Sequence, residues 1–206
     1  MKKAPLCLLA IALLLPGYVL RAQESLPIAL GFRAGLNLGD NSANFTPVSK
    51  SLRTAPLFGA YSEFGIAQAL FLTGEFTYLP GGTNLSYGNF NGTFKVDEFI
   101  IPVSLKYKIL GNAKVLKPYF FTGLNVGFVT NSELETVGGT FSFKDSTETV
   151  DWGWHIGGGI EIPTSDLVAV TLDARYSLGL VNLDKSGADS KSRNLSFIVG
   201  VNFRAN

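Results

Sequence analysis

Strict alternation of apolar and polar residues constrains this sequence more than any other feature. From Ile28 to Leu38 every even-numbered residue is apolar, and the odd-numbered ones are Ala, Gly, Arg, Gly and Asn. Successive side chains of a β-strand point to opposite faces, whereas a helical period would mix the two sets. The segment therefore predicts a strand with one apolar face and one small or polar face.

Seven further segments repeat the pattern, at 58–66, 70–78, 98–108, 119–128, 151–162, 168–178 and 194–204. Most are close to the roughly nine to eleven residues with which a tilted strand crosses a bilayer. Short connections lie near 67–69, 110–116 and 163–166, and long polar connections cover 39–55, 80–96, 130–150 and 180–193. Short turns that alternate with long loops are typical of outer-membrane barrels. We predict an all-β fold, an eight-stranded antiparallel up-and-down transmembrane β-barrel, with both termini on the periplasmic side.

The N-terminus has the pattern of a signal peptide. Lys2 and Lys3 precede a short apolar run from Leu6 to Leu15, and Ala22 is a small residue suited to signal peptidase. We expect cleavage after Ala22, so that residues 1–22 are a signal peptide and residues 23–206 form the barrel domain. The mature chain would then lack Cys7, the one cysteine of the sequence, and could form no disulfide.

Composition excludes several classes of partner and fold. Charged residues make up 16% of the chain, against about 25% in ordinary globular domains. Removal of the signal peptide takes three basic residues from the 17 and leaves 14 against 16 acidic ones, a net charge of −2. No basic stripe suggests a nucleic-acid partner. The mature chain has one histidine and no cysteine, so it cannot assemble a metal cluster from these ligands, and we expect no cofactor.

A soluble, lipocalin-like barrel would show the same alternation with its apolar face inside. Glycine argues for the inverted arrangement, because small residues suit the crowded interior of an eight-stranded barrel. The polar faces of the predicted strands carry Gly31, Gly35, Gly59, Gly65, Gly123, Gly127, Gly157 and Gly159. Lipid also tolerates no open sheet edge, and eight strands are enough to close a barrel. We therefore expect the polar face to line the lumen.

Aromatic residues gather toward the ends of the predicted strands. Toward the long loops lie Phe58, Tyr78, Phe99, Phe128, Trp152, Tyr176 and Phe197. Toward the short turns lie Phe64, Tyr107, Phe120 and Phe203. Two aromatic belts around an aliphatic band match the two interfaces of a membrane. A soluble core would have little reason to sort aromatic residues in this way.

Three short segments, Glu98–Val103, Lys117–Gly123 and Arg175–Leu180, resemble the PorT-like outer-membrane β-barrel family, as does the glycine run 157–159 before a short turn. The resemblance covers essentially the whole mature chain. It implies an outer-membrane barrel that is, in some members, an accessory to protein secretion. One departure is the C-terminus, because such barrels commonly end on an aromatic residue, whereas three residues follow Phe203 here.

Ten charged residues fall on the predicted inward face: Arg33, Glu63, Glu75, Glu98, Lys106, Lys108, Glu161, Asp173, Arg175 and Arg204. They could line a narrow ion path. Buried charges must be paired, however, and eight strands leave little room for water. We interpret these residues as a structural network of paired charges that fills the lumen.

His155 is the candidate for acid–base chemistry. It lies on the inward face of its strand, near Asp151, while the same-face position that follows it is Gly157. Loop serines such as Ser142 and Ser146 are too common to be diagnostic. A lipid-modifying enzyme would need His155 to meet a serine and an acid at one rim. We interpret His155 as structural and predict no catalytic residue.

The long loops hold the remaining candidates. Asp145, Glu148 and Asp151 form a loose acidic run that is either a weak cation site or a solvated loop. Aromatic and polar residues in or next to the loops could contact a partner or a surface sugar, namely Asn44, Tyr87, Phe90 and Phe94. We expect a monomeric, non-enzymatic barrel in contact with outer-membrane lipid, which acts through its loops as a structural, adhesive or secretion-accessory protein. The alternatives are an outer-membrane lipid-modifying enzyme and a soluble ligand-binding barrel.

Overall fold

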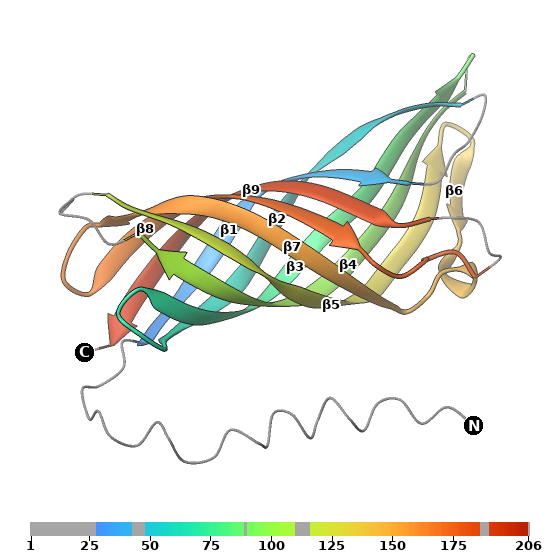
Figure 1. The fold of residues 1–206 in the computed structure, drawn as a ribbon. Helices are drawn as coiled ribbons and strands as arrows, with labels where there is room; N and C mark the ends of the chain where they lie inside the picture. The colour runs from blue at the N-terminus through green and yellow to red at the C-terminus, as the bar shows by residue number, and fades with distance from the viewer. Residues whose placement is uncertain (1–27, 43–47, 89, 110–115, 186–189, 206) are drawn as a thin grey trace, which may run out of the picture.

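In a computed structural model of the protein, antiparallel strands close into a barrel (Figure 1). The structure describes residues 28–42, 48–88, 90–109, 116–185 and 190–205. The ring consists of β1 (Ile28–Asn41), β2 (Ser49–Gly65), β3 (Leu70–Tyr87), β4 (Phe90–Lys108), β5 (Lys117–Thr136), β7 (Val150–Pro163), β8 (Val168–Gly179) and β9 (Ser192–Ala205). Each strand pairs with the next along the ring, and β1 closes it by pairing with β9. The predicted fold class is confirmed.

Both ends of the barrel chain lie at the end where the short turns are. Ile28 at the start of β1 pairs with Ala205 at the end of β9 (Figure 1). The predicted signal peptide falls on residues 1–27, outside the described residues. Within the described ranges, no helix is long and apolar enough to cross a membrane.

The two faces of the barrel have inverted polarity relative to a soluble protein. On β1, Leu30 and Phe32 are 60% and 69% exposed, whereas Arg33, on the inward face, is 5% exposed. The same alternation runs along the other ring strands, with large apolar side chains outside and mainly polar ones inside. A soluble barrel would bury its apolar face, so the expectation of a polar lumen holds and the soluble alternative is wrong.

Glycine allows the strands to bring inward side chains together. Gly35 on β1 lies in register between Leu57 and Ile198, and Gly123 on β5 lies between Ser104 and His155. A Cβ atom at either glycine would collide with a carbonyl of the neighbouring strand. These positions therefore require the smallest residue because other atoms occupy the space of a side chain.

The strands extend further than the sequence predicted at the long-loop end. Residues 80–96 were expected to be a loop, but β3 runs to Tyr87 and β4 begins at Phe90. Polar side chains help to hold this extension: Thr83 donates a hydrogen bond to the Ser51 carbonyl (3.0 Å), and Thr93 donates one to Asn84 (3.0 Å). The prediction was wrong because Thr, Asn and Ser suggested a loop, whereas cross-strand pairing overrides local preference.

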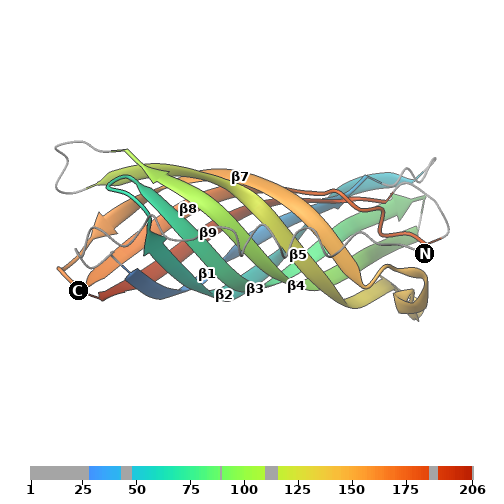
Figure 2. The ribbon, with the colours of Figure 1, turned by 60° about the horizontal axis from the view of Figure 1, so that its bottom comes forward.

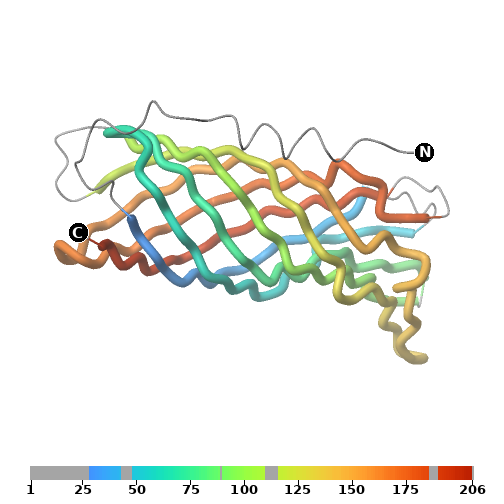
Figure 3. Tube along the Cα trace, turned by 90° about the horizontal axis from the view of Figure 1, so that it is seen from below, coloured from blue at the N-terminus to red at the C-terminus, as the bar shows by residue number. Residues whose placement is uncertain are grey.

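A short strand, β6 (Gly139–Ser142), and a 3₁₀ turn, η1 (Lys144–Ser146), occupy part of the predicted loop 130–150. β6 pairs with the end of β5, so that β2, β3, β4, β5 and β6 form an open sheet beyond the closed ring. Figure 2 shows the oblique strands of the ring, and Figure 3 shows β5, β6 and η1 projecting at the long-loop end. We call this open sheet the projecting sheet.

The lipid-facing band generates a stability prediction. Leu124 lies outward on β5, midway between Phe120 and Phe128, and is 59% exposed. We expect Leu124→Arg to destabilise the barrel folded in lipid vesicles by roughly 2–4 kcal/mol, because arginine near the bilayer midplane is poorly solvated. Urea titrations followed by gel mobility of unboiled samples measure the change. Thr140→Arg, on the projecting sheet, is the matched control, and an equal loss at both positions would contradict the assignment of the lipid face.

Candidate functional site

Charged side chains fill the lumen near the short turns. Glu63 on β2 accepts from Lys106 (2.8 Å) and Lys108 (2.5 Å). Lys108 also contacts Glu161 (2.9 Å), which in turn pairs with Arg204 (2.6 Å). Five predicted lumen charges thus form one chain of ion pairs that crosses the barrel.

A second network lies in the middle of the lumen. Arg33 contacts Glu75 (3.1 Å) and Asp173 (2.9 Å), and Arg175 also contacts Glu75 (2.5 Å). The Tyr119 hydroxyl donates a hydrogen bond to Asp173. Three of these four charged side chains are at most 4% exposed, and Asp173 is fully buried. At such burial each charge depends on its partner, because an unpaired charge in a low-dielectric interior is very costly.

An apolar layer crosses the lumen next, on the long-loop side of the central network. It consists of Leu57, Leu79, Ile100 and Ile198, which are 2% to 6% exposed and contact one another. The sequence analysis did not assign these residues to the lumen. Apolar doublets such as Ile100–Ile101 and Ile198–Val199 carry the missed signal, because one member of each pair must face inward on a strand. The layer places four apolar side chains from β2, β3, β4 and β9 between the central network and the long-loop end of the lumen.

Nine of the ten predicted lumen charges therefore lie in the two networks, and Glu98 stands apart. Glu98 is 5% exposed on β4, on the long-loop side of the apolar layer. No ion pair joins it to another described residue. Its neighbour Asp97 pairs with Arg53 (2.7 Å), a contact that the sequence analysis did not foresee.

His155 meets a serine that the sequence analysis did not consider as its partner. Ser104 Oγ lies 2.7 Å from His155 Nε2, because register places Ser104, Gly123 and His155 on adjacent strands. His155 Nδ1 has no hydrogen-bond partner among the described residues, so no acid orients the imidazole as in a catalytic triad. Both side chains are buried, at 2% and 1% exposure. The pair fills the lumen and has no open approach for a lipid chain.

The predicted aromatic belts lie on the outer surface. Phe58, Tyr78, Phe99 and Phe128 are register partners across β2 to β5, with ring centroids of 5.4 Å between Phe58 and Tyr78 and 5.3 Å between Tyr78 and Phe99. Around the rest of the barrel, and toward the short turns, half-exposed or exposed rings belong to Trp152, Tyr176, Phe197, Phe64, Tyr107, Phe120 and Phe203. Tyr107 and Phe120 contact each other at 5.2 Å.

The loop candidates separate in space. Asp145 is exposed in η1, whereas Asp151 is 2% exposed inside β7, so the acidic run does not converge on one point. In the part of the chain that the structure describes, no three His, Cys, Asp or Glu side chains gather as a metal cluster. Tyr87, Phe90 and Phe94 lie on the projecting sheet, and Asn44 falls outside the described residues.

Loop residues cover the outer mouth of the lumen. Leu183 packs on Val96 and Val129, with Phe94 beside them. Backbone hydrogen bonds fix Leu183 there: its carbonyl accepts from Glu148 (2.8 Å), and its amide donates to Ser190 (2.8 Å). Leu183 thus forms an apolar lid over β4 and β5 at the outer mouth of the lumen.

Comparison with known families now adds to this geometry. The sequence profile of the outer membrane protein beta-barrel domain family matches residues 21–185. The chain belongs to this family. Its lipid-facing exterior and polar interior agree with the assignment, and the protein is located in the outer membrane of a Gram-negative bacterium. No curated protein sequence matches the chain.

Solved outer-membrane proteins share the fold. The outer membrane protein OprG from Pseudomonas aeruginosa superposes with a TM-score of 0.56 at 11% identity, over 88% of this chain and 95% of OprG. Neisserial surface protein A gives a TM-score of 0.54 at 13% identity, over 86% of this chain and 96% of its own. At these identities the similarity concerns the barrel architecture alone.

The central network predicts a large difference between two conservative substitutions. Glu75→Gln removes the acidic partner of Arg175 and one of two partners of Arg33, so we expect a loss of roughly 3–5 kcal/mol in folding stability. Glu133→Gln, on the projecting sheet 3.5 Å from Lys95, should cost less than about 1 kcal/mol. Urea unfolding in detergent micelles measures both. Equal losses would show that the lumen pairs add nothing beyond surface pairs.

Proposed function

We propose that this protein is a non-enzymatic outer-membrane barrel that presents its projecting sheet as a binding surface for an extended polypeptide. The observation that carries the proposal is the contrast between a sealed lumen and an open, partly apolar sheet beyond the membrane. Within this proposal, the PorT-like resemblance favours an accessory role in protein secretion over a purely adhesive one. The same geometry supports an extracellular position for the sheet and a periplasmic position for both termini.

A sealed lumen argues against solute passage. Ion-pair networks, an apolar layer and the Leu183 lid follow one another along the barrel axis. An eight-stranded barrel has an interior only wide enough for side chains to fill. The filled lumen therefore makes the barrel rigid, and we assign the interaction with partners to the surface outside the lumen.

The outward-facing side chains change from apolar to polar where the projecting sheet begins. Below the row of Phe58, Tyr78, Phe99 and Phe128, outward residues are mainly apolar. Above that row, outward register partners are polar, as in the row Gly82, Lys95, Glu133 and Ser142 and the row Asn84, Thr93, Glu135 and Thr140. Lys95 and Glu135 pair at 2.6 Å, and this hydrogen bond raises the pKa of Lys95 and lowers the pKa of Glu135. The outward face of the projecting sheet is thus polar, as expected for a surface in contact with water.

The inner face of the projecting sheet is apolar and partly uncovered. Register places Phe94, Leu134 and Phe141 side by side on β4, β5 and β6. Phe143 packs against Phe94 with ring centroids 6.3 Å apart, yet Phe141 remains 56% exposed and Phe143 41% exposed. Exposed aromatic rings that form a contiguous patch are typical of interaction surfaces.

The outer edge of β6 adjoins this patch. β6 pairs with β5 on one side, and no other described strand pairs with its opposite side. An open edge can accept an added strand through main-chain hydrogen bonds, while alternate side chains of that strand enter apolar sites. Edge and patch together suit an extended polypeptide with apolar residues at every second position. A protein that is being secreted exposes such segments before it folds.

The enzyme alternative has less support. Ser104 and His155 make a serine–histidine contact, but it lies inside the sealed lumen and lacks an orienting acid. A lipid acyl chain approaches from the outer surface, where the described belt residues offer no such pair. We therefore assign the Ser104–His155 contact a structural role.

Planar-bilayer recordings test the sealed lumen. We expect purified, refolded protein to give no stable porin-like conductance, because the apolar layer and the ion pairs exclude a continuous water column. A porin reconstituted in the same bilayers serves as the control for insertion. Large and steady openings from this protein would refute the sealed lumen and redirect the proposal toward transport.

Site-specific photocrosslinking in living cells tests the binding surface. A benzophenone amino acid at Phe141, on the inner face, should give a discrete protein adduct, whereas the same group at Thr140, on the outer face of the same strand, should give little. Identical adducts at both positions, or none at either, would contradict a binding role for the inner face.

The secreted proteome tests the accessory role. A deletion strain complemented with Phe141→Ser should retain part of the secretion defect of the deletion, and complementation with Thr140→Ser should restore secretion. Full restoration by both variants would count against secretion and leave adhesion as the form of the proposed function.

A further inference from the structure

The hairpins β3–β4 and β5–β6 end in exposed apolar side chains. Val137, in the turn between β5 and β6, is 97% exposed, and Tyr87 and Phe90, which flank the turn between β3 and β4, are 57% and 41% exposed. The two turns are neighbours, because β4 pairs with β3 from Phe90 onward and with β5 from Gly92 onward. We call Tyr87, Phe90 and Val137 the apolar tip of the projecting sheet.

Both hairpin ends lack charged residues. Residues 80–94 and 136–143 contain no Asp, Glu, Lys or Arg, although charged residues make up 16% of the chain. On β4 and β5 the first charges below the tip are outward ones, where Lys95 lies within 3.5 Å of both Glu133 and Glu135. Charged groups are the most costly to remove from water, so the tip can leave water far more easily than the strands below it. The neighbouring long connections differ, because they carry Lys144, Asp145, Glu148, Lys185, Lys191 and Arg193.

Polar groups next to the tip are hydrogen-bonded within the protein. The Thr136 hydroxyl accepts a hydrogen bond from the Gly138 amide (3.2 Å) and donates one to the Gly139 carbonyl (3.0 Å). On the neighbouring hairpin, the Thr93 hydroxyl donates to the Asn84 side chain (3.0 Å). A polar group that is already hydrogen-bonded costs less to remove from water than an unpaired one. These bonds therefore favour a tip that enters an apolar phase.

The apolar tip stands well above the bilayer that holds the barrel. On both hairpins nine residues separate it from the aromatic row, from Tyr78 to Tyr87 and from Phe128 to Val137. At about 3.3 Å per residue and a strand tilt of about 45°, the tip lies roughly 20 Å above the row. Figure 1 shows both hairpins at the end of the barrel away from the C-terminus. A lipid surface that meets the tip must therefore belong to another membrane.

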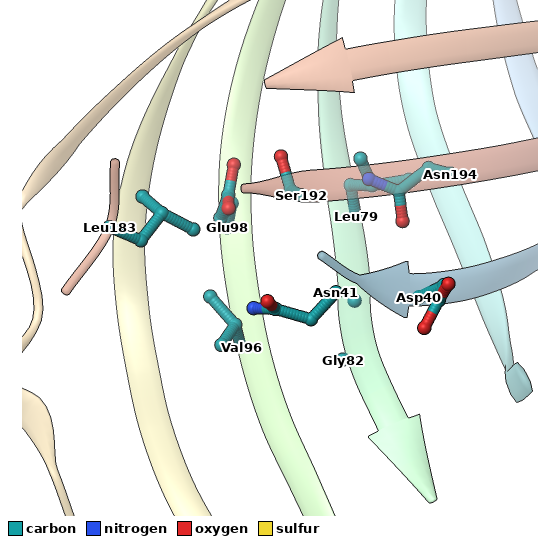
Figure 4. Close-up of a pocket in the computed structure, with 10 residues that line it drawn as sticks. Asp40, Asn41, Leu79, Gly82, Val96, Glu98, Leu183, Ser192 and Asn194 are labelled. Atoms are coloured by element: carbon teal, nitrogen blue, oxygen red, sulfur yellow. The ribbon is translucent and has the colours of Figure 1, made fainter. Parts of the chain in front are cut away.

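Packed side chains hold the base of the projecting sheet in position. Leu183 packs on Val96 of β4 and Val129 of β5. Figure 4 shows Leu183 and Val96 lining a hollow at this base, whose size is about that of one water molecule. Because the base is fixed, the tip loses little conformational freedom when it binds, and less of the binding free energy is lost to ordering.

We propose that the apolar tip inserts into a second phospholipid bilayer, the membrane of another cell or vesicle that faces the bacterial surface. Aromatic and aliphatic side chains gain free energy when they leave water for acyl chains, and tyrosine favours the interface between headgroups and acyl chains. Insertion stops at the tip, because Lys95, Glu133 and Glu135 below it stay in water. This contact goes beyond the proposed polypeptide binding, which uses the inner face of the projecting sheet.

Flotation of protein-free phosphatidylcholine vesicles with the mature protein in lipid nanodiscs tests the apolar tip, since the nanodisc covers the lipid-facing band. We expect the wild-type protein to float with the vesicles. Val137→Asp and Tyr87→Asp should each weaken binding at least about tenfold, because a carboxylate must lose its water to enter the bilayer. Ser142→Asp is the matched control. It adds the same charge in the row of Lys95 and Glu133 and should bind as the wild type does.

Fluorescence distinguishes insertion from adhesion to lipid headgroups. The sequence has no cysteine besides Cys7, in the predicted signal peptide, so Val137→Cys and Ser142→Cys each give the mature protein one labelling site. An environment-sensitive dye at position 137 should shift to the blue on addition of vesicles and be quenched by brominated acyl chains. The same dye at position 142 should show neither effect.

Gel mobility with and without boiling checks that the variants fold, which we expect because the Val137 side chain is almost wholly exposed. Absence of flotation by the wild type, or equal binding by Val137→Asp and the wild type, would overturn the proposal. Binding without quenching at position 137 would overturn it as well. So would binding that requires anionic phosphatidylglycerol in the vesicles, since charge and not the apolar tip would then hold the bilayer.

Discussion

Closure of the hydrogen-bonded ring is the constraint on which the rest of this structure depends. A strand in lipid must pair on both edges, and the pairing of β1 with β9 from Ile28 to Asn41 satisfies the last pair of edges. Closure with eight strands also fixes a narrow interior, so every inward side chain must fit against those opposite. Gly35 and Gly123 follow from this narrow interior, because a larger side chain would not fit there. The larger inward side chains that carry charge are brought close enough to form ion pairs.

Charge and apolar packing divide the interior between them. The ion-pair networks keep buried charges neutral as groups, while Leu57, Leu79, Ile100 and Ile198 separate the central network from the outer mouth. Glu98 lies beyond that layer, and no ion pair joins it to Arg33, Arg175 or another basic residue that the structure describes. The proposed binding surface depends on the same rigid interior, because a projecting sheet needs a firm base.

Alternation made the ring strands, their outward faces and the class of fold predictable from the sequence. It was less informative where both faces are apolar or both are polar. At Ile100–Ile101 and Ile198–Val199 the inward member was missed, because an apolar doublet does not show which residue faces the lumen. The extension of β3 and β4 was missed because polar strands in water have the composition of loops. The contact between Ser104 and His155 depends on register across three strands, which no local pattern contains.

The reversal of polarity at the row of Phe58, Tyr78, Phe99 and Phe128 also fixes how deep the protein sits. Sinking the barrel toward the periplasm would carry Lys95 and Glu133 into hydrocarbon, and raising it would expose the aromatic row and the aliphatic band to water. Both displacements cost free energy, so the band has one preferred depth. A bilayer whose apolar thickness differs from that of the band must deform around the barrel, since a closed sheet cannot tilt single strands to adapt. The protein thereby imposes a local membrane thickness on the lipid that surrounds it.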